Sequence, residues 1–148
     1  MFRTRAQNQA VDNNSNNGVT RCIVPTEKRP DTLNQFFGKF CVLFEHSVYN
    51  VTDYLSSDYK GGYWDFFQLS NGGFYMAPVT DREFNVVNPG NFFEGKLKAD
   101  ALGIASCLMA LSHLSFKYPE AMFADLFHLL RNFAAGHEDG AQIMRLID

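Results

Sequence analysis

A nucleophile, a base and an acid can be assembled on paper from Ser70, His113 and Asp65, a set that would suit hydrolysis. Serine hydrolases of the α/β class hold the nucleophile in a G-x-S-x-G turn between a strand and a helix, because that turn exposes the hydroxyl group. The chain contains no such motif, and His113 falls inside a predicted helix rather than in a loop. The sequence therefore predicts no catalytic residues, and a hydrolase that uses Ser70 or a cysteine is the weaker alternative.

Metal-binding side chains are equally scattered along the chain. No two histidines form an H-x-H or H-x-x-x-H pair and no two cysteines form a C-x-x-C pair, the close spacings common in zinc sites. The paired glycines at 61–62 and 72–73 read as turn glycines, because the phosphate-loop motif G-x-x-x-x-G-K-[ST] is absent. We expect reduced thiols, no metal, no cofactor and no small-molecule substrate. The side chains concerned are His46, His113, His128, His137, Cys22, Cys41 and Cys107.

The densest aromatic stretch is GGYWDFFQLSNGGFYMAP, residues 61–78. Residues 63–69 and 73–79 are β-prone, and the Asn-Gly between them predicts a hairpin with a type I′ turn, in which both turn residues have positive φ. Such aromatic strands could stack nucleic-acid bases, so a nucleic-acid-binding module is the alternative function. Basic residues near the hairpin are limited to Lys60 and Arg82, which disfavours that alternative.

The side chains discussed above must be positioned by the helices and strands of the chain. The order of the expected elements predicts an α+β fold, in which a small antiparallel β-meander of three to four strands packs with several α-helices. The C-terminal third is expected to be helical. Alternation at residues 40–44 would also suit a strand, but helical spacing continues beyond it and favours a helix. The predicted helices are 31–37, about 43–57, 99–116, 119–135 and 140–148, and the predicted strands are 63–69, 73–79, 84–87 and 92–97.

Charge is unevenly distributed along the chain. Residues 1–30 carry five basic and two acidic side chains (+3), whereas residues 31–148 carry eight basic and fourteen acidic ones (−6). Nucleic-acid binders usually cluster lysine and arginine, so the acidic part is expected to repel phosphate backbones. Residues 1–24 are expected to form a disordered polar tail and residues 25–148 a single domain. The sequence shows neither an export signal nor an apolar run long enough to span a bilayer. We therefore expect a cytoplasmic protein.

Three blocks of the sequence resemble the ArdB/KlcA family of antirestriction proteins. They are YKGGYWDFFQLSNGGFYMAP, GNFFEGKLKADALGIASCLMALS and the closing RLID. The similarity runs from about residue 25 to residue 148 and is densest over residues 59–111. The resemblance implies a small bacterial protein, typically carried on plasmids or genomic islands, that relieves type I restriction of incoming unmodified DNA. It implies a compact α+β fold and no enzyme activity, cofactor or metal.

The resemblance also implies a candidate contact site. The family carries a basic residue just before the first helix, a glutamate in the next segment and the tryptophan of the GGYW block. These positions are matched by Arg29 (or Lys28), Glu45 and Trp64, with Tyr63 as a neighbour. Trp64 alone could be a core anchor or an interface hot spot. We expect the site to contact the type I restriction-modification complex or a factor controlling it, without strong DNA binding.

Overall fold

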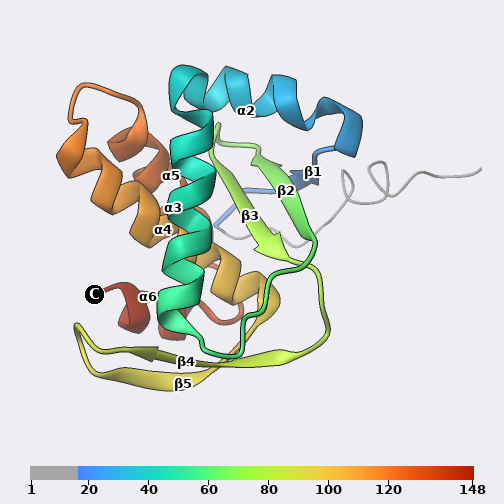
Figure 1. Ribbon diagram of the computed structural model, residues 1–148. Helices are drawn as coiled ribbons and strands as arrows, with labels where there is room; N and C mark the ends of the chain where they lie inside the picture. The colour runs from blue at the N-terminus through green and yellow to red at the C-terminus, as the bar shows by residue number, and fades with distance from the viewer. Residues whose placement is uncertain (1–16) are drawn as a thin grey trace, which may run out of the picture.

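The fold combines helices and antiparallel strands in the α+β class that the sequence predicts (Figure 1). The computed structural model describes residues 17–148, so most of the predicted tail lies outside the described residues. The strands are β1 (Arg21–Ile23), β2 (Trp64–Leu69), β3 (Phe74–Pro78), β4 (Glu83–Asn88) and β5 (Phe93–Lys98). The helices are α2 (Arg29–Phe37), α3 (Cys41–Leu55), α4 (Ala99–Lys117), α5 (Phe123–Ala135) and α6 (Gly140–Ile147), with 3-10 turns η1 (Thr26–Lys28) and η2 (Gly38–Phe40).

The chain enters the fold earlier than predicted. The sequence places residues 17–24 in the tail, yet β1 pairs antiparallel with β2, with Ile23 opposite Phe67. Val19, Ile23 and Val24 are buried in the core. A strand of three residues carries almost no periodic signal of its own, and β1 is a strand because β2, 41 residues further on, supplies its hydrogen-bonding partner.

The strands form two sheets rather than one continuous meander. β1, β2 and β3 form a three-stranded antiparallel sheet in that order, and β4 and β5 form a separate two-stranded sheet. The reason lies at Met76 in β3, whose backbone N–H and carbonyl group both hydrogen-bond the thiol of Cys107 in α4 at 3.5 Å. α4 therefore covers the outer edge of β3, where β4 would otherwise pair.

The hairpin between β2 and β3 forms as predicted, but its turn is not type I′. Gly72 has a φ of 94°, whereas Asn71 keeps a negative φ. The Leu69 carbonyl oxygen accepts a hydrogen bond from the Gly72 N–H at 3.0 Å, and the Asn71 side-chain oxygen accepts one from the Gly73 N–H at 3.0 Å. The Asn71 side chain also donates to the Leu129 carbonyl oxygen. These contacts fix a longer loop closed by a left-handed glycine.

The helix expected to begin at Pro119 begins instead at Phe123. Pro119 lies in a turn in which the Ala121 N–H donates to the Tyr118 carbonyl oxygen at 3.0 Å. Proline suits the second position of such a turn as well as the first turn of a helix, so its presence did not distinguish the two. The helix expected from about residue 43 begins at Cys41, within the usual uncertainty of a helix end.

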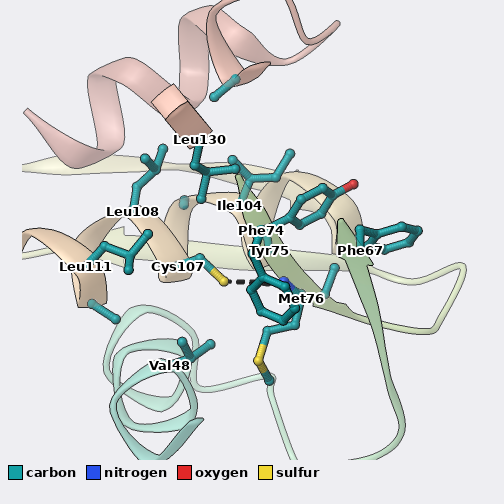
Figure 2. Packing of buried hydrophobic residues seen from close by; sticks show 14 of the residues in the cluster. Val48, Phe67, Phe74, Tyr75, Met76, Ile104, Cys107, Leu108, Leu111 and Leu130 are labelled. Carbon is teal, nitrogen blue, oxygen red and sulfur yellow. Dashed lines mark hydrogen bonds between the residues drawn. The ribbon is translucent and has the colours of Figure 1, made fainter. Parts of the chain in front are cut away.

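The core is built around α4, which contacts α3, α5, α6, β3, β4 and β5. α4 passes so close to β3 that a Cβ at Gly103 would lie 2.5 Å from the Ala77 Cα and 2.6 Å from the Met76 carbonyl oxygen. Figure 2 shows Cys107 beside Met76, with Leu108 and neighbouring aliphatic side chains around them. Burial raises the pKa of the Cys107 thiol to about 12, so the thiol stays protonated and can donate to Met76.

By length and composition, α4 could cross a membrane, and among the described helices it alone passes that test. However, 67% of this stretch is buried inside the protein. The surrounding strands and helices therefore pack against the apolar surface of α4, as expected of a helix at the centre of a core.

A polar cluster fastens the start of α4 to three other segments. The Asp100 carboxylate accepts hydrogen bonds from Arg21 (3.0 Å), from the Tyr75 hydroxyl (2.8 Å) and from Nε2 of His137 (2.8 Å). Nδ1 of His137 accepts the Asp139 N–H at 2.9 Å, so Nε2 carries the proton that it donates to Asp100. The sequence pattern did not reveal this cluster, because its members come from β1, β3, α4 and the α5–α6 loop.

Substituting Gly103→Ala is expected to lower the free energy of unfolding by about 1–3 kcal/mol, although alanine is the better helix former. The added methyl group would overlap the backbone of β3 at Ala77 and force α4 away from the sheet. Urea denaturation measures the change. His113→Ala, at an exposed position of the same helix, is the control and should stay within about 0.5 kcal/mol of the wild type. A Gly103→Ala protein as stable as the wild type would contradict the close packing.

Substituting Asp100→Asn is expected to cost about 1–3 kcal/mol and to weaken the pH dependence of stability below pH 5. Burial alone would raise the pKa of Asp100, but the His137 hydrogen bond, the Arg21 charge and the Tyr75 hydroxyl outweigh it and hold the pKa below 3.8. The wild type therefore has this stabilisation above about pH 4 and loses it as the pH falls through the lowered pKa.

Denaturation curves for both proteins between pH 7 and pH 3 test this expectation. The stability difference between wild type and Asp100→Asn should shrink toward the acid end of the series. A difference that stays constant across the series would show that the Asp100 carboxylate does not supply the pH dependence.

Candidate functional site

A pocket of about 640 Å³ lies where the start of α2, the first turns of α3 and the start of β2 meet. Figure 1 shows α2 at one end of the molecule, above the three-stranded sheet, and the β4–β5 hairpin at the opposite end. The four residues of the predicted contact site all line this pocket. Its lining is Arg29, Pro30, Leu33, Asn34, Cys41, Glu45, Tyr49, Gly62, Tyr63, Trp64 and Phe66.

Arg29 is held between two aromatic rings. Its guanidinium carbon lies 4.9 Å from the ring centre of Tyr63 and 4.5 Å from that of Phe66. Nη2 donates to the Tyr63 hydroxyl at 3.1 Å and lies 3.6 Å from Oδ1 of Asp65, whose side chain is 8% exposed. Nε is buried without a hydrogen-bond partner among the described residues. The guanidinium plane is thereby fixed, while part of its donor capacity stays unused.

Glu45 and Tyr49 form the opposite polar wall. They are one helical turn apart on α3, and the Tyr49 hydroxyl donates to Oε2 of Glu45 at 3.2 Å. Burial, followed by the charge of Glu45, raises the pKa of Tyr49 above its ordinary value, so the hydroxyl remains a donor at neutral pH. Glu45 is half-buried, and among the described residues the hydrogen bond from Tyr49 is the one that its carboxylate accepts.

Trp64 and Tyr63 lie in very different environments although they are adjacent in the chain. Trp64 is 3% exposed, its Nε1 donates to the Tyr59 hydroxyl at 3.0 Å, and its ring packs nearly perpendicular to the rings of Tyr49 and Tyr59. Tyr63 is 55% exposed. Trp64 is thus a core residue that forms a wall of the pocket, while much of the Tyr63 side chain is exposed to solvent.

Comparisons with known proteins decide the family. The family model for antirestriction proteins matches residues 57–148. The antirestriction protein KlcA of Escherichia coli is 38% identical over 141 residues, which cover 92% of this chain and 99% of that protein. The chain belongs to the antirestriction protein family. The uncharacterised protein YafX of E. coli K12 is also 38% identical, over 88% of each chain.

One solved structure is similar to this chain in fold as well as in sequence. It is reported to show a novel fold of the KlcA and ArdB proteins and antirestriction activity against type I DNA restriction systems in vivo but not in vitro. It superposes on this chain with a TM-score of 0.82 and 39% identity, covering 88% of this chain and 95% of that chain. The α+β fold described above is therefore that of the family.

The set assembled from Ser70, His113 and Asp65 does not form a site in this antirestriction protein. Asp65 lies near the start of β2 and Ser70 directly follows its end, so the two are roughly 16 Å apart by strand geometry. The Ser70 hydroxyl accepts the Thr20 N–H, Asp65 pairs with Arg29, and His113 is exposed on α4. Within residues 17–148, no group of three metal-ligating side chains comes together.

The structure does not support the base-stacking alternative, because β2 and β3 present no exposed aromatic platform. The aromatic side chains of β2 and β3, which the sequence suggested as a platform, are buried on both faces of the sheet. Tyr63, just before β2, is the exposed aromatic residue of this stretch. Sequence reasoning also missed Tyr49 and the role of Asp65. The spacing of Glu45 and Tyr49, four residues apart on a predicted helix, could have indicated the first of these.

Substituting Arg29→Lys is expected to lower the free energy of unfolding by about 1 kcal/mol, because an ammonium group cannot stack on the rings of Tyr63 and Phe66 as a planar guanidinium does. Urea denaturation followed by Trp64 fluorescence measures this loss. Arg131→Lys, an exposed arginine on α5, is the matched control and should be neutral. Equal stability of the Arg29→Lys protein and the control would show that the stacking contributes nothing.

Proposed function

We propose that this protein relieves type I restriction of incoming unmodified DNA by binding another protein through the pocket of Arg29, Glu45, Tyr63 and Trp64. The observation that supports this proposal is that these four side chains surround one pocket in a chain of the antirestriction family. The protein would act in the cytoplasm as a binding surface, with no bond made or broken. No cofactor is required for this action.

Charge favours a protein partner over DNA. B-DNA carries about one negative charge per 1.7 Å of helix axis, and a protein that binds it neutralises phosphates with lysine and arginine side chains. Residues 31–148 carry a net charge of −6, which opposes that binding. The same segment is a poor imitation of DNA, because eight basic side chains interrupt its fourteen acidic ones. A discrete contact through a few fixed side chains is therefore the simpler mechanism.

The relative with a solved structure supports a particular kind of partner. Its antirestriction activity against type I systems is reported in vivo but not in vitro. An inhibitor that occupied the DNA groove of the restriction enzyme would be expected to act on the purified enzyme as well. For the present chain, we therefore favour a cellular factor that controls restriction over the restriction complex itself.

Within the pocket, three of the four side chains would have different roles according to their exposure. Tyr63 is exposed and contributes contact area, as interface tyrosines commonly do. Arg29 fixes the Tyr63 ring through stacking and a hydrogen bond. Trp64 is buried and shapes the wall behind them. A partner would thus meet a prearranged surface, which limits the entropy lost on binding.

The proposal is tested by transforming cells that carry a type I system with unmodified plasmid, with and without this protein. We expect the protein to raise the yield of transformants toward that obtained with modified plasmid. Cells without the type I system provide the baseline for both plasmids. Equal yields with and without the protein would overturn the proposed function.

Tyr63→Ala is expected to abolish most of this protection while leaving the protein folded, because the removed ring is largely exposed. Loss of an interface hot spot commonly costs at least about 2 kcal/mol of binding, or roughly 30-fold in affinity. Tyr54→Ala, which removes a ring with 57% exposure near the end of α3, is the matched control. Protection that survives in Tyr63→Ala as it does in Tyr54→Ala would remove the pocket from the mechanism.

A further inference from the structure

We propose that the pocket binds an arginine side chain of the partner protein, with Glu45 as the group that binds its guanidinium. This inference rests on the proposed function, because it takes the pocket as the contact site. It adds the chemical class of the group that enters.

The charge of the pocket favours a cation. Arg29 and Glu45 are the charged residues of the lining. The charge of Arg29 is balanced by Asp65, whose carboxylate oxygen lies 3.6 Å from Nη2. Within residues 17–148, no ion pair joins Glu45 to a basic side chain, and its carboxylate has the Tyr49 hydroxyl as its hydrogen-bond partner. Arg29, Asp65 and Glu45 therefore sum to one net negative charge, centred on Glu45.

The walls of the pocket suit the long apolar stem of an arginine. Leu33, Trp64 and Phe66 line its apolar side, and the volume of about 640 Å³ leaves room for such a side chain together with part of its backbone. Arg29 already demonstrates how this site holds a guanidinium, stacked on the rings of Tyr63 and Phe66. A second guanidinium would meet Glu45 through two parallel N–H donors, which a lysine cannot supply.

The net charge of the protein favours a basic partner segment. The whole chain carries a net charge of −3, and residues 31–148 carry −6. Such a body attracts a basic segment over distance and raises its association rate, more so at low salt. Gly62, which also lines the pocket, has open space beside its Cα, because a Cβ there would meet no atom within 4 Å.

Trp64 makes the inference directly measurable, because it is the only tryptophan and it forms a wall of the pocket. The probe is N-acetyl-arginine amide, and its matched control is N-acetyl-citrulline amide, which has nearly the same shape without the charge. Binding is followed by Trp64 fluorescence and by the NMR shift of its indole N–H. We expect saturable binding of the arginine amide with a Kd of about 1 mM, and binding of the citrulline amide at least ~10-fold weaker.

Glu45→Gln is expected to weaken binding of the arginine amide by ~10-fold or more, because it removes the charge while keeping the shape. Glu94→Gln, at an exposed position of β5 on the distant hairpin, should leave it unchanged. Circular dichroism confirms that both variants fold. Equal binding of the arginine and citrulline amides, or unchanged binding in Glu45→Gln, would overturn the inference. So would preferential binding of N-acetyl-aspartate amide, which would make this an anion site built on Arg29.

The transformation assay, run in parallel, separates the two levels of failure. If Tyr63→Ala loses protection but the arginine amide does not bind, the contact surface stands and the arginine inference is wrong. If the arginine amide binds as expected but the wild-type protein gives no protection, the proposed function is wrong and the ligand class stands.

Discussion

The close contact between α4 and the outer edge of β3 is the constraint on which the remaining structure depends. Gly103 brings the helix against the strand, and the Cys107 thiol satisfies both outward-facing backbone groups of Met76. Because α4 covers that edge, β4 cannot pair with β3, and β4 and β5 form a separate two-stranded sheet. The Asp100 cluster then fixes where α4 begins, since it joins that helix to β1, β3 and the α5–α6 loop.

The pocket forms at the opposite edge of the three-stranded sheet, where β1 pairs with only part of β2. β1 is short and pairs with the last residues of β2, so the first residues of β2 meet α2 and α3 instead of another strand. Arg29, at the start of α2, reaches across to Tyr63, Asp65 and Phe66 and holds this corner together. The same contacts that complete the fold there also line the pocket, so the proposed contact site depends on an arginine that stabilises this corner.

Local pattern predicted the helices, the hairpin and the α+β class, because each depends on residues close in sequence. It failed where a distant partner decides the outcome. β1 needs β2, the hairpin turn is set by Asn71 contacting Leu129, and β4 is excluded from the first sheet by Cys107. For the site, Arg29, Glu45, Tyr63 and Trp64 came from a family resemblance, and the structure places them around one pocket. Asp65 had no local signal for its pairing with Arg29, because 36 residues separate them.

A contact made in the cell through this pocket is tested most directly by site-specific photo-crosslinking. A photoreactive phenylalanine analogue replaces Tyr63 in one strain and the similarly exposed Tyr54 in another, both carrying a type I system. We expect one protein to be captured from position 63 and not from position 54, and we expect deletion of that protein to remove the protection of unmodified DNA. The same capture from both positions, or protection that persists after the deletion, would contradict a partner contact at the pocket.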